Sequence, residues 1–141
     1  MRPLSTQRMV HWIVCEQSDR WYRAVCRFAP ELIGPEHTLR VERTSFEAAK
    51  QVVALAKAVR GVTILCWEFP LGLADYASRL EPIATIRFDS PDVLQIACLP
   101  STASPELLLW GQEAGLTIFL QGPEALQQAG EIVTRHVRPL G

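Results

Sequence analysis

Apolar runs of strand length alternate with amphipathic segments of helical length along most of the chain. Continuous apolar runs indicate strands buried on both faces, and an apolar residue at every third or fourth position indicates a helix with one buried side. The strands expected from this pattern are residues 9–15, 62–66, 93–98 and 116–120, with a shorter, mixed candidate at 37–42. The helical stripes are Trp21, Val25, Phe28, Ala29 and Leu32; Phe46, Ala49, Val52, Val53, Ala56 and Val59; Leu73, Tyr76, Ala77 and Leu80; and Leu126, Ala129, Ile132, Val133 and Val137.

Glycine, proline and capping residues set the ends of these helices. Gly34-Pro35 and Gly61 end the first two, and Ser104 caps a further helix that begins at Pro105. The helix before that one is expected to stop near Pro82, because proline lacks the backbone N–H that a helix interior needs. Residues 82–91 then fit a loop, an irregular turn or an extra edge strand. The other expected turns and loops are 16–19, 70–72, 100–104 and 121–123.

The alternation of strand and helix predicts an α/β fold with a parallel sheet covered by helices on both faces and joined by right-handed crossovers. In such a sheet the carboxyl ends of the strands meet at one edge, where open α/β folds build their sites. Three of the apolar runs end on a cysteine: Cys15, Cys66 and Cys98. We therefore expect these thiols near one another at that edge.

Composition restricts the class of protein. The 141 residues, 48% hydrophobic and 21% charged, fit one domain over 1–141 with a short N-terminal arm over about residues 1–8. The formal net charge of −1 disfavours binding to nucleic acid or anionic lipid. No apolar run reaches the length of a membrane span, and residues 1–8 lack the apolar centre of an export signal. Four cysteines without Cys-x-x-Cys spacing favour a reduced, cytoplasmic protein.

Two segments carry a resemblance to a known family. They are Leu65-Cys66-Trp67-Glu68-Phe69-Pro70, and the stretch 113–126, EAGLTIFLQGPEAL. Together, in this order and separation, they resemble the response-regulator receiver (CheY-like) domain. The resemblance implies a flavodoxin-like, doubly wound parallel sheet of five strands in the order 2-1-3-4-5.

The chain departs from that family at the positions that carry its chemistry. Active members hold a divalent cation with acidic residues after strand one, phosphorylate an Asp at the end of strand three, and use a Thr or Ser after strand four and a Lys before a Pro. Here the matching positions hold Cys15 and Glu16, then Cys66, then Ala97 or Cys98, and finally Gly122. Only Glu16 keeps the expected chemistry, so the resemblance implies a degenerate phospho-acceptor pocket without a metal or cofactor.

Two further interpretations concern this pocket. Glu68 could act as a displaced acceptor, although a solvent-facing loop carboxylate is the preferred interpretation. Cys15, Cys66 and Cys98 could form a thiol-based redox sensor or a soft-metal site, but zinc thiolate sites need four ligands and buried cysteines usually act as small hydrophobes. No histidine is placed beside Cys66 for nucleophilic catalysis, so we expect no enzyme. A small-molecule site at the sheet edge stays open.

The segment Leu107-Leu108-Leu109-Trp110 indicates a contact surface. Four consecutive apolar residues surround most of a helix, so at least one should be exposed unless the C-terminal tail covers it. The resemblance places the dimer or partner surface on the fourth helix, fifth strand and fifth helix, with Leu108, Trp110 and Phe119 as candidates. The sequence thus predicts a phosphorylation-independent pseudo-receiver that binds a protein partner or a second copy, as a signalling adaptor.

Overall fold

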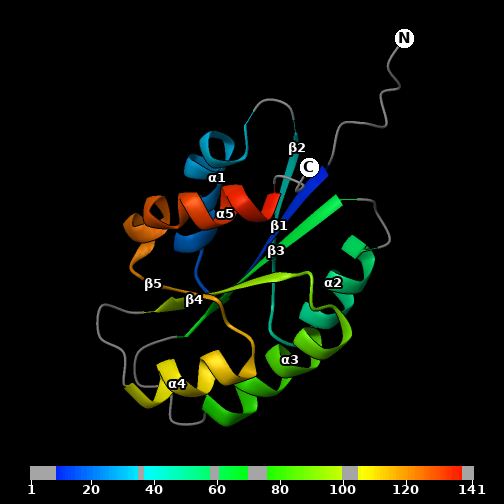
Figure 1. Cartoon of the computed structure of the whole chain (residues 1–141), viewed down its shortest axis with the longest axis vertical. Helices are drawn as coiled ribbons and strands as arrows, with labels where there is room; N and C mark the ends of the chain where they lie inside the picture. Colours follow the sequence, from blue (N-terminus) through cyan, green and yellow to red (C-terminus); the bar gives the residue numbers. More distant parts are fainter. Residues whose placement is uncertain (1–8, 35–36, 58–60, 70–75, 100–104, 138–141) are drawn as a thin grey trace.

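Five parallel strands form one sheet in the order β2-β1-β3-β4-β5 (Figure 1). The computed structural model describes residues 9–34, 37–57, 61–69, 76–99 and 105–137. The expected arm over residues 1–8, the turn at 70–72 and the loop at 100–104 with its Ser104 cap lie outside these ranges. The flavodoxin-like order expected from the resemblance is confirmed. The strands are β1 Met9–Cys15, β2 Thr38–Thr44, β3 Gly61–Glu68, β4 Leu94–Leu99 and β5 Ile118–Gln121.

Helices cover both faces of the sheet (Figure 1). One face carries α1 (Arg20–Ile33), the 3₁₀ helix η2 (Pro123–Ala129) and α5 (Gly130–Val137), whose apolar residues share a core with Val10, Trp12 and Val14 of β1. The other face carries α2 (Ala49–Lys57), α3 (Tyr76–Asp89) and α4 (Pro105–Ala114), which pack on Ile13 and Cys15. Alternate β1 residues therefore belong to opposite cores, as the two-residue repeat of a strand requires.

The expectation that the third helix stops near Pro82 is wrong, and the three alternatives for residues 82–91 are wrong as well. Helix α3 continues through Pro82 to Asp89. Proline inside a helix costs about 3 kcal/mol. Ile83 and Ile86 offset this cost because both are buried against the sheet, and burying such a side chain contributes roughly 1.5–3 kcal/mol. In addition, the buried Gln95 amide donates a hydrogen bond of 3.1 Å to the Ile83 carbonyl.

Two other differences affect the C-terminal part and the sheet edge. The final helical stripe is not a single α-helix, because residues 123–129 form 3₁₀ turns before α5 begins at Gly130. Strand β3 runs two residues beyond Cys66, to Glu68. None of the helices in the described ranges has the length and hydropathy needed to cross a membrane.

Candidate functional site

The carboxyl ends of β1, β3 and β4 define the edge of the sheet that we call the rim. In the register, Cys66 lies opposite Val14 and Ile96, one level below the pair formed by Cys15 and Trp67. Cys98 lies opposite Glu68. The three cysteines therefore do not end their strands at one level, and the last residue of β3 at the rim is Glu68.

Cys66, which the sequence resemblance places at the acceptor position, is an interior residue. Its side chain has no exposed surface and belongs to the core beneath α1 and α5. The indole Nε1 of Trp12 donates a hydrogen bond of 3.0 Å to its sulfur. A phosphoryl donor approaching from solvent therefore meets packed apolar side chains instead of an accessible nucleophile.

The other two rim cysteines are equally buried but do not form a three-thiol site. Cys98 shares the core of Cys66, whereas Cys15 lies on the opposite face of the sheet with Trp67. Burial raises the pKa of both Cys15 and Cys98, so these thiols resist forming the thiolates that bind metals or react. Within the described ranges no three His, Cys, Asp or Glu side chains are grouped to hold a metal ion. The soft-metal alternative is therefore not supported.

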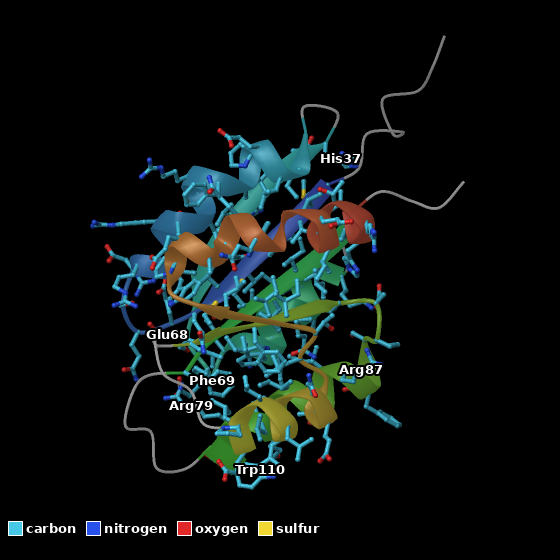
Figure 2. All side chains as sticks on the ribbon, turned by 60° about the vertical axis from the view of Figure 1, so that its left-hand side comes forward. His37, Glu68, Phe69, Arg79, Arg87 and Trp110 are labelled. Atoms are coloured by element: carbon cyan, nitrogen blue, oxygen red, sulfur yellow. The ribbon has the colours of Figure 1, made fainter. Side chains whose placement is uncertain are left out.

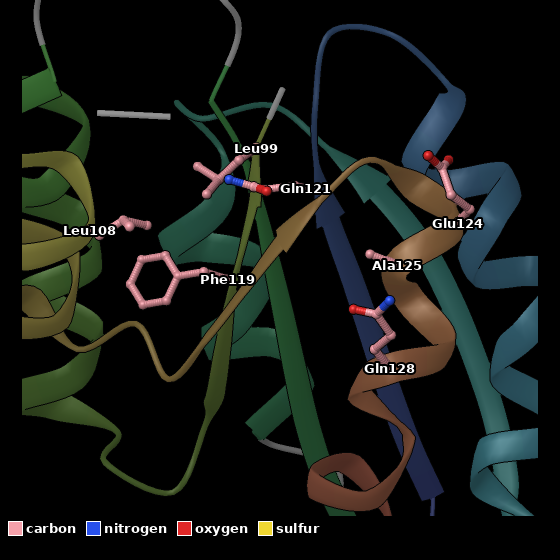
Figure 3. Close-up of a pocket in the computed structure, with 7 residues that line it drawn as sticks. All are labelled: Leu99, Leu108, Phe119, Gln121, Glu124, Ala125 and Gln128. Carbon is pink, nitrogen blue, oxygen red and sulfur yellow. The ribbon is translucent and has the colours of Figure 1, made fainter. Parts of the chain in front are cut away.

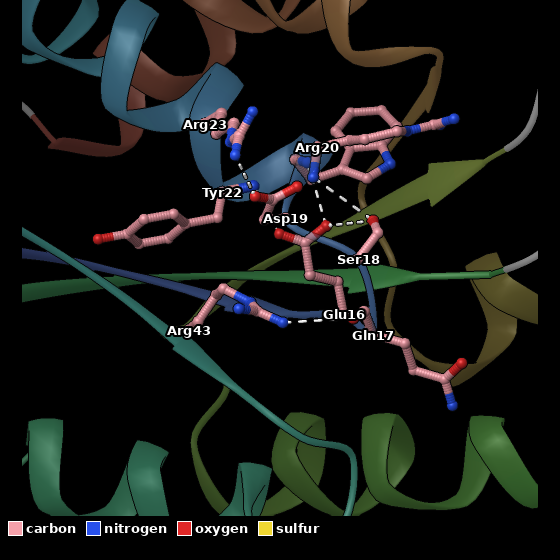
Figure 4. A network of polar contacts seen from close by, with 9 residues as sticks. Glu16, Gln17, Ser18, Asp19, Arg20, Tyr22, Arg23 and Arg43 are labelled. Carbon is pink, nitrogen blue, oxygen red and sulfur yellow. Dashed lines mark hydrogen bonds and ion pairs between the residues drawn. The ribbon is translucent and has the colours of Figure 1, made fainter.

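Glu16 is a buried carboxylate that caps helix α1. Its two oxygens accept hydrogen bonds from the backbone N–H groups of Trp21 (3.0 Å) and Tyr22 (2.6 Å), as Figure 4 shows for this network. Asp19 stands at the N-cap position but its side chain makes no capping bond. A carboxylate at this end also interacts favourably with the helix dipole. The one residue that keeps the family's acidic chemistry is thus engaged in holding α1.

Glu68 is tied to the same loop, so its interpretation as a solvent-facing loop carboxylate is wrong. It ends β3, is half-buried, and accepts a hydrogen bond of 3.1 Å from the backbone N–H of Gln17. The Ser18 hydroxyl lies 3.1 Å from Glu68 Oε2 and 3.1 Å from Glu16 Oε1. Its single hydrogen serves one carboxylate at a time. Ser18 therefore links the end of β3 to the loop after β1, a role that no motif in the sequence indicates.

The remaining pocket positions offer no phosphate contacts. Ala97 and Cys98 lie within β4, are buried, and have no side-chain hydroxyl group. Gly122 has φ 91° and ψ 147°, a conformation close to one that essentially only glycine adopts. A lysine at position 122 would strain the backbone, and the described structure has glycine there with its N–H bonded to the Leu99 carbonyl at 3.1 Å.

No protein-family model matches the chain, and no curated protein sequence does. Solved structures do. A CheY-like protein, TadZ, from Pseudomonas aeruginosa has a TM-score of 0.68 at 14% identity, covering 93% of this chain and 95% of that one. A protein from Burkholderia pseudomallei described as related to pilus assembly has 0.67 at 17% identity, over 93% and 92%. A CheY-like receiver protein from Methanospirillum hungatei has 0.53 at 13%, over 92% and 96%.

The chain has the CheY-like receiver fold. Identities of 13–17% to these structures carry the fold and not the activity. In this receiver fold the polar groups at the rim are hydrogen-bonded to one another, and the buried side chain of Trp67 packs next to them. The indole N–H of Trp67 donates a hydrogen bond of 2.8 Å to the side-chain oxygen of the buried Gln95, and the Trp67 ring centroid lies 5.2 Å from that of Phe46. The guanidinium of Arg79, labelled in Figure 2, lies 3.8 Å from the Phe46 centroid in a cation–π contact.

Helix α4 and the adjoining cavity against β5 and η2 form a second feature of the receiver fold, beside the carboxyl end of β4. Leu107 is buried and Leu108 half-buried, whereas Leu109 and Trp110 are 55% and 48% exposed, which confirms that this helix cannot bury all four residues. A cavity of about 410 Å³, which we call the groove, opens beside Leu108 and Phe119 (Figure 3). Its lining residues are Leu99, Leu108, Phe119, Gln121, Glu124, Ala125 and Gln128.

Trp110 does not line this groove. Two helical positions separate it from Leu108, which turns its side chain about 200° around α4. Figure 2 places it at the outer end of the molecule below α3 and α4. The three residues expected to form one contact surface therefore divide between the groove, with Leu108 and Phe119, and a separate exposed flank.

Proposed function

We propose that this protein is a phosphorylation-independent pseudo-receiver that acts by binding protein partners and catalyses no reaction. The observation that carries the proposal is the environment of Cys66. The acceptor position holds a thiol that is fully buried and hydrogen-bonded by Trp12. A phosphoryl group would need that side chain to leave the core.

The groups that assist phosphoryl transfer support the same conclusion. Mg²⁺ needs hard oxygen ligands in octahedral geometry. Both carboxylate oxygens of Glu16 already accept hydrogen bonds from backbone N–H groups in the first turn of α1. Charge on a transferred phosphoryl group needs cations around it, and Gly122 supplies none. These features support a loss of both metal binding and phosphate stabilisation.

What the chain retains is a rigid scaffold with exposed apolar surface on α4. Leu109 and Trp110 are large apolar side chains in contact with solvent, and aromatic residues of this kind are enriched at protein interfaces. One structural neighbour is described as related to pilus assembly. A role as an adaptor within a protein assembly, read through contacts and not through phosphorylation, fits both observations.

The test is exposure of the purified protein to Mg²⁺ with beryllofluoride and, separately, with acetyl phosphate. Intact mass spectrometry reports a covalent phosphoryl group, and ¹H–¹⁵N spectra report any change in the rim amides. An active receiver domain treated in parallel serves as the positive control. We expect no mass increase and no shift at Glu16, Cys66 or Glu68.

A phosphoryl adduct on the wild-type protein would overturn the proposal. The variant Glu68→Gln then identifies its position: loss of the adduct assigns Glu68 as a displaced acceptor, and persistence assigns another residue. Magnesium-dependent shifts of rim amides without an adduct would also contradict the proposed loss of metal binding.

A further inference from the structure

A further cavity opens at the end of the sheet opposite the rim, between the last turns of α3 and α5. Its volume is about 340 Å³, within the range of sites that hold small molecules. Leu94 begins β4 and Thr117 directly precedes β5, so this cavity, which we call the basal pocket, lies at the amino ends of both strands. Figure 2 shows Arg87, one of its lining residues, on the opposite side of the molecule from Glu68.

The basal pocket joins an apolar wall to two cations. Leu94 and Ile132 belong to the apolar wall, and the charged groups among the described lining residues are the guanidinium groups of Arg87 and Arg135, with no carboxylate. His136 also lines the pocket, but burial lowers the pKa of its imidazole, which therefore adds no positive charge at neutral pH. A guanidinium group donates paired hydrogen bonds to carboxylate and phosphate groups.

Arg87 is held in place by packing along its stem. Its Cβ, Cγ and Cδ atoms lie so close to Gly115 that a Cβ on that glycine would be 2.8, 2.9 and 3.2 Å from them. In the described part of the chain its guanidinium group has no hydrogen bond or ion pair. A fixed stem with free donors lowers the entropy that a ligand has to remove when it binds.

Arg135 has one partner that a ligand can replace. Its guanidinium lies 2.7 Å from a carboxylate oxygen of Glu131, one helical turn earlier, and the two side chains are 77% and 76% exposed. Exposed ion pairs of this kind contribute at most about 1 kcal/mol. An anion in the basal pocket can therefore share or take the hydrogen bonds of Arg135 at little cost.

Negative charge also occurs around the basal pocket. Asp92 is close to His136 but forms an ion pair with Lys57 at 2.7 Å, and the exposed Asp89 does not line the cavity. The C-terminal ends of α3 and α5 carry the negative ends of the helix dipoles, each of which interacts with a nearby charge by about 0.3–1 kcal/mol. The overall field therefore does not attract anions. Affinity has to come from direct contact with the two guanidinium groups together with burial of an apolar part.

We propose that the basal pocket binds a small organic anion, with its carboxylate or phosphate group on Arg87 and Arg135 and its apolar body on Leu94 and Ile132. The pocket is at the opposite end of the sheet from the degenerate acceptor pocket, so the proposal stands independently of the proposed function. An inorganic anion lacks the apolar part, and a neutral apolar molecule lacks the charge, so neither should bind well.

The experiment titrates the full chain with phenyl phosphate and with phenylacetate, followed in ¹H–¹⁵N spectra. Inorganic phosphate and benzyl alcohol are the controls, because they carry only the charge or only the ring. We expect at least one aromatic anion to bind about tenfold or more tightly than either control, with shifts at the amides of Leu94, Thr117 and Ile132. The tighter of the two aromatic anions identifies the anionic group that the pocket prefers.

Variants locate the anionic group. Arg87→Gln and Arg135→Gln keep part of the stem but lose the charge, and each should weaken binding by about fivefold or more. Glu131→Gln releases Arg135 from its ion pair and should tighten binding by about twofold. The matched control is Arg23→Gln, since Arg23 is also an exposed helical arginine with an ion pair one turn away, to Asp19 at 2.7 Å. It should change affinity less than about twofold.

Circular dichroism of each variant confirms that the fold is retained. Equal weakening by Arg23→Gln would reduce the effect to general charge and overturn the proposal. So would full binding by the double variant of Arg87 and Arg135, or benzyl alcohol that binds as tightly as both anions. Shifts confined to the rim amides, or none with any probe up to about 10 mM, would also overturn it. None of these results alters the phosphorylation test, which reports on the rim alone.

Discussion

Replacing Glu16 discriminates between a metal ligand and a helix cap. Its carboxylate is buried, and it accepts two hydrogen bonds from the first turn of α1 and lies 3.1 Å from the Ser18 hydroxyl. Glu16→Ala leaves two backbone N–H groups without an acceptor at the start of a 14-residue helix. Glu16→Gln keeps the shape of the side chain, but turns an NH₂ group towards one of those donors.

The cost follows from the bonds that are lost. Loss of a side-chain cap costs roughly 0.5–2 kcal/mol, and a hydrogen bond to a charged acceptor contributes about 1.5–3 kcal/mol. Since these bonds are buried and partly compensated by water after truncation, we expect Glu16→Ala to lower the free energy of unfolding by about 2–4 kcal/mol. Glu16→Gln should lose roughly half as much, because one accepting oxygen remains. At about 2–4 °C per kcal/mol, Tm falls by roughly 4–16 °C for the alanine variant.

The assay is urea unfolding followed by circular dichroism and tryptophan fluorescence, with and without Mg²⁺. The exposed Glu47→Ala variant controls for the loss of one surface carboxylate. A cap predicts the same loss in both buffers. If Glu16→Gln is as stable as the wild-type protein, or if the loss appears only when Mg²⁺ is present, the carboxylate does not act as the cap of α1.

Three further predictions use other parts of the fold. Gly61→Ala should cost about 2–4 kcal/mol in urea unfolding, because its Cβ would lie 2.0 Å from the Met9 carbonyl oxygen of the neighbouring strand; an unchanged midpoint contradicts this. Thiol titration should find Cys26 reacting at once and the three buried cysteines only after denaturation, and a second fast thiol refutes the burial argument. Burial lowers the pKa of His136 in the folded protein, so below about pH 6.5 the unfolded chain binds more protons than the folded one. The free energy of unfolding therefore decreases as the pH is lowered, by less than about 1 kcal/mol for this half-buried group. His136→Gln should remove that contribution, measured by unfolding at pH 5 and pH 7.5, and an identical slope in the variant contradicts it.

The sheet could be predicted from the sequence because its central strands are apolar on both faces. Residues of β1 and β4 are almost all buried, so their continuous apolar runs directly reflect their environment. The edge strand β2 alternates in exposure, and its candidate at 37–42 was correspondingly weaker and shorter than Thr38–Thr44. The strand order came from the resemblance and not from the pattern itself.

Helix α3 could not be predicted because its stability is tertiary. Proline is a local signal to stop, and locally nothing around Pro82 opposes it. The opposing terms are the burial of Ile83 and Ile86 and a hydrogen bond from Gln95, twelve residues away in the chain. Such contacts exist only once β4 and α3 are adjacent, so a local pattern cannot contain them.

The rim was predicted by residue type but not by role. The resemblance places Cys66 at the acceptor position, but the sequence does not show that β3 continues to Glu68 and leaves the thiol inside the sheet. It also does not show that Ser18 lies between two carboxylates, because the groups concerned are separated by up to 50 residues. The hydrogen-bond partners at the strand ends depend on the pairing register, and a shift of β3 by one residue would change them.

The distribution of satisfied and unsatisfied polar groups separates the two candidate surfaces. At the rim, Glu16 and Glu68 each hold backbone donors of the chain itself, so a ligand there would have to replace bonds that already stabilise the fold. In the groove, Glu124 and Gln128 hold no such bonds within the described ranges, so a partner gains their interactions without breaking any. A buried or half-buried polar group that loses its hydrogen bond destabilises the fold, whereas an exposed polar group can exchange water for another partner at little cost. The rim of this receiver fold is therefore a structural joint between β1, α1 and β3.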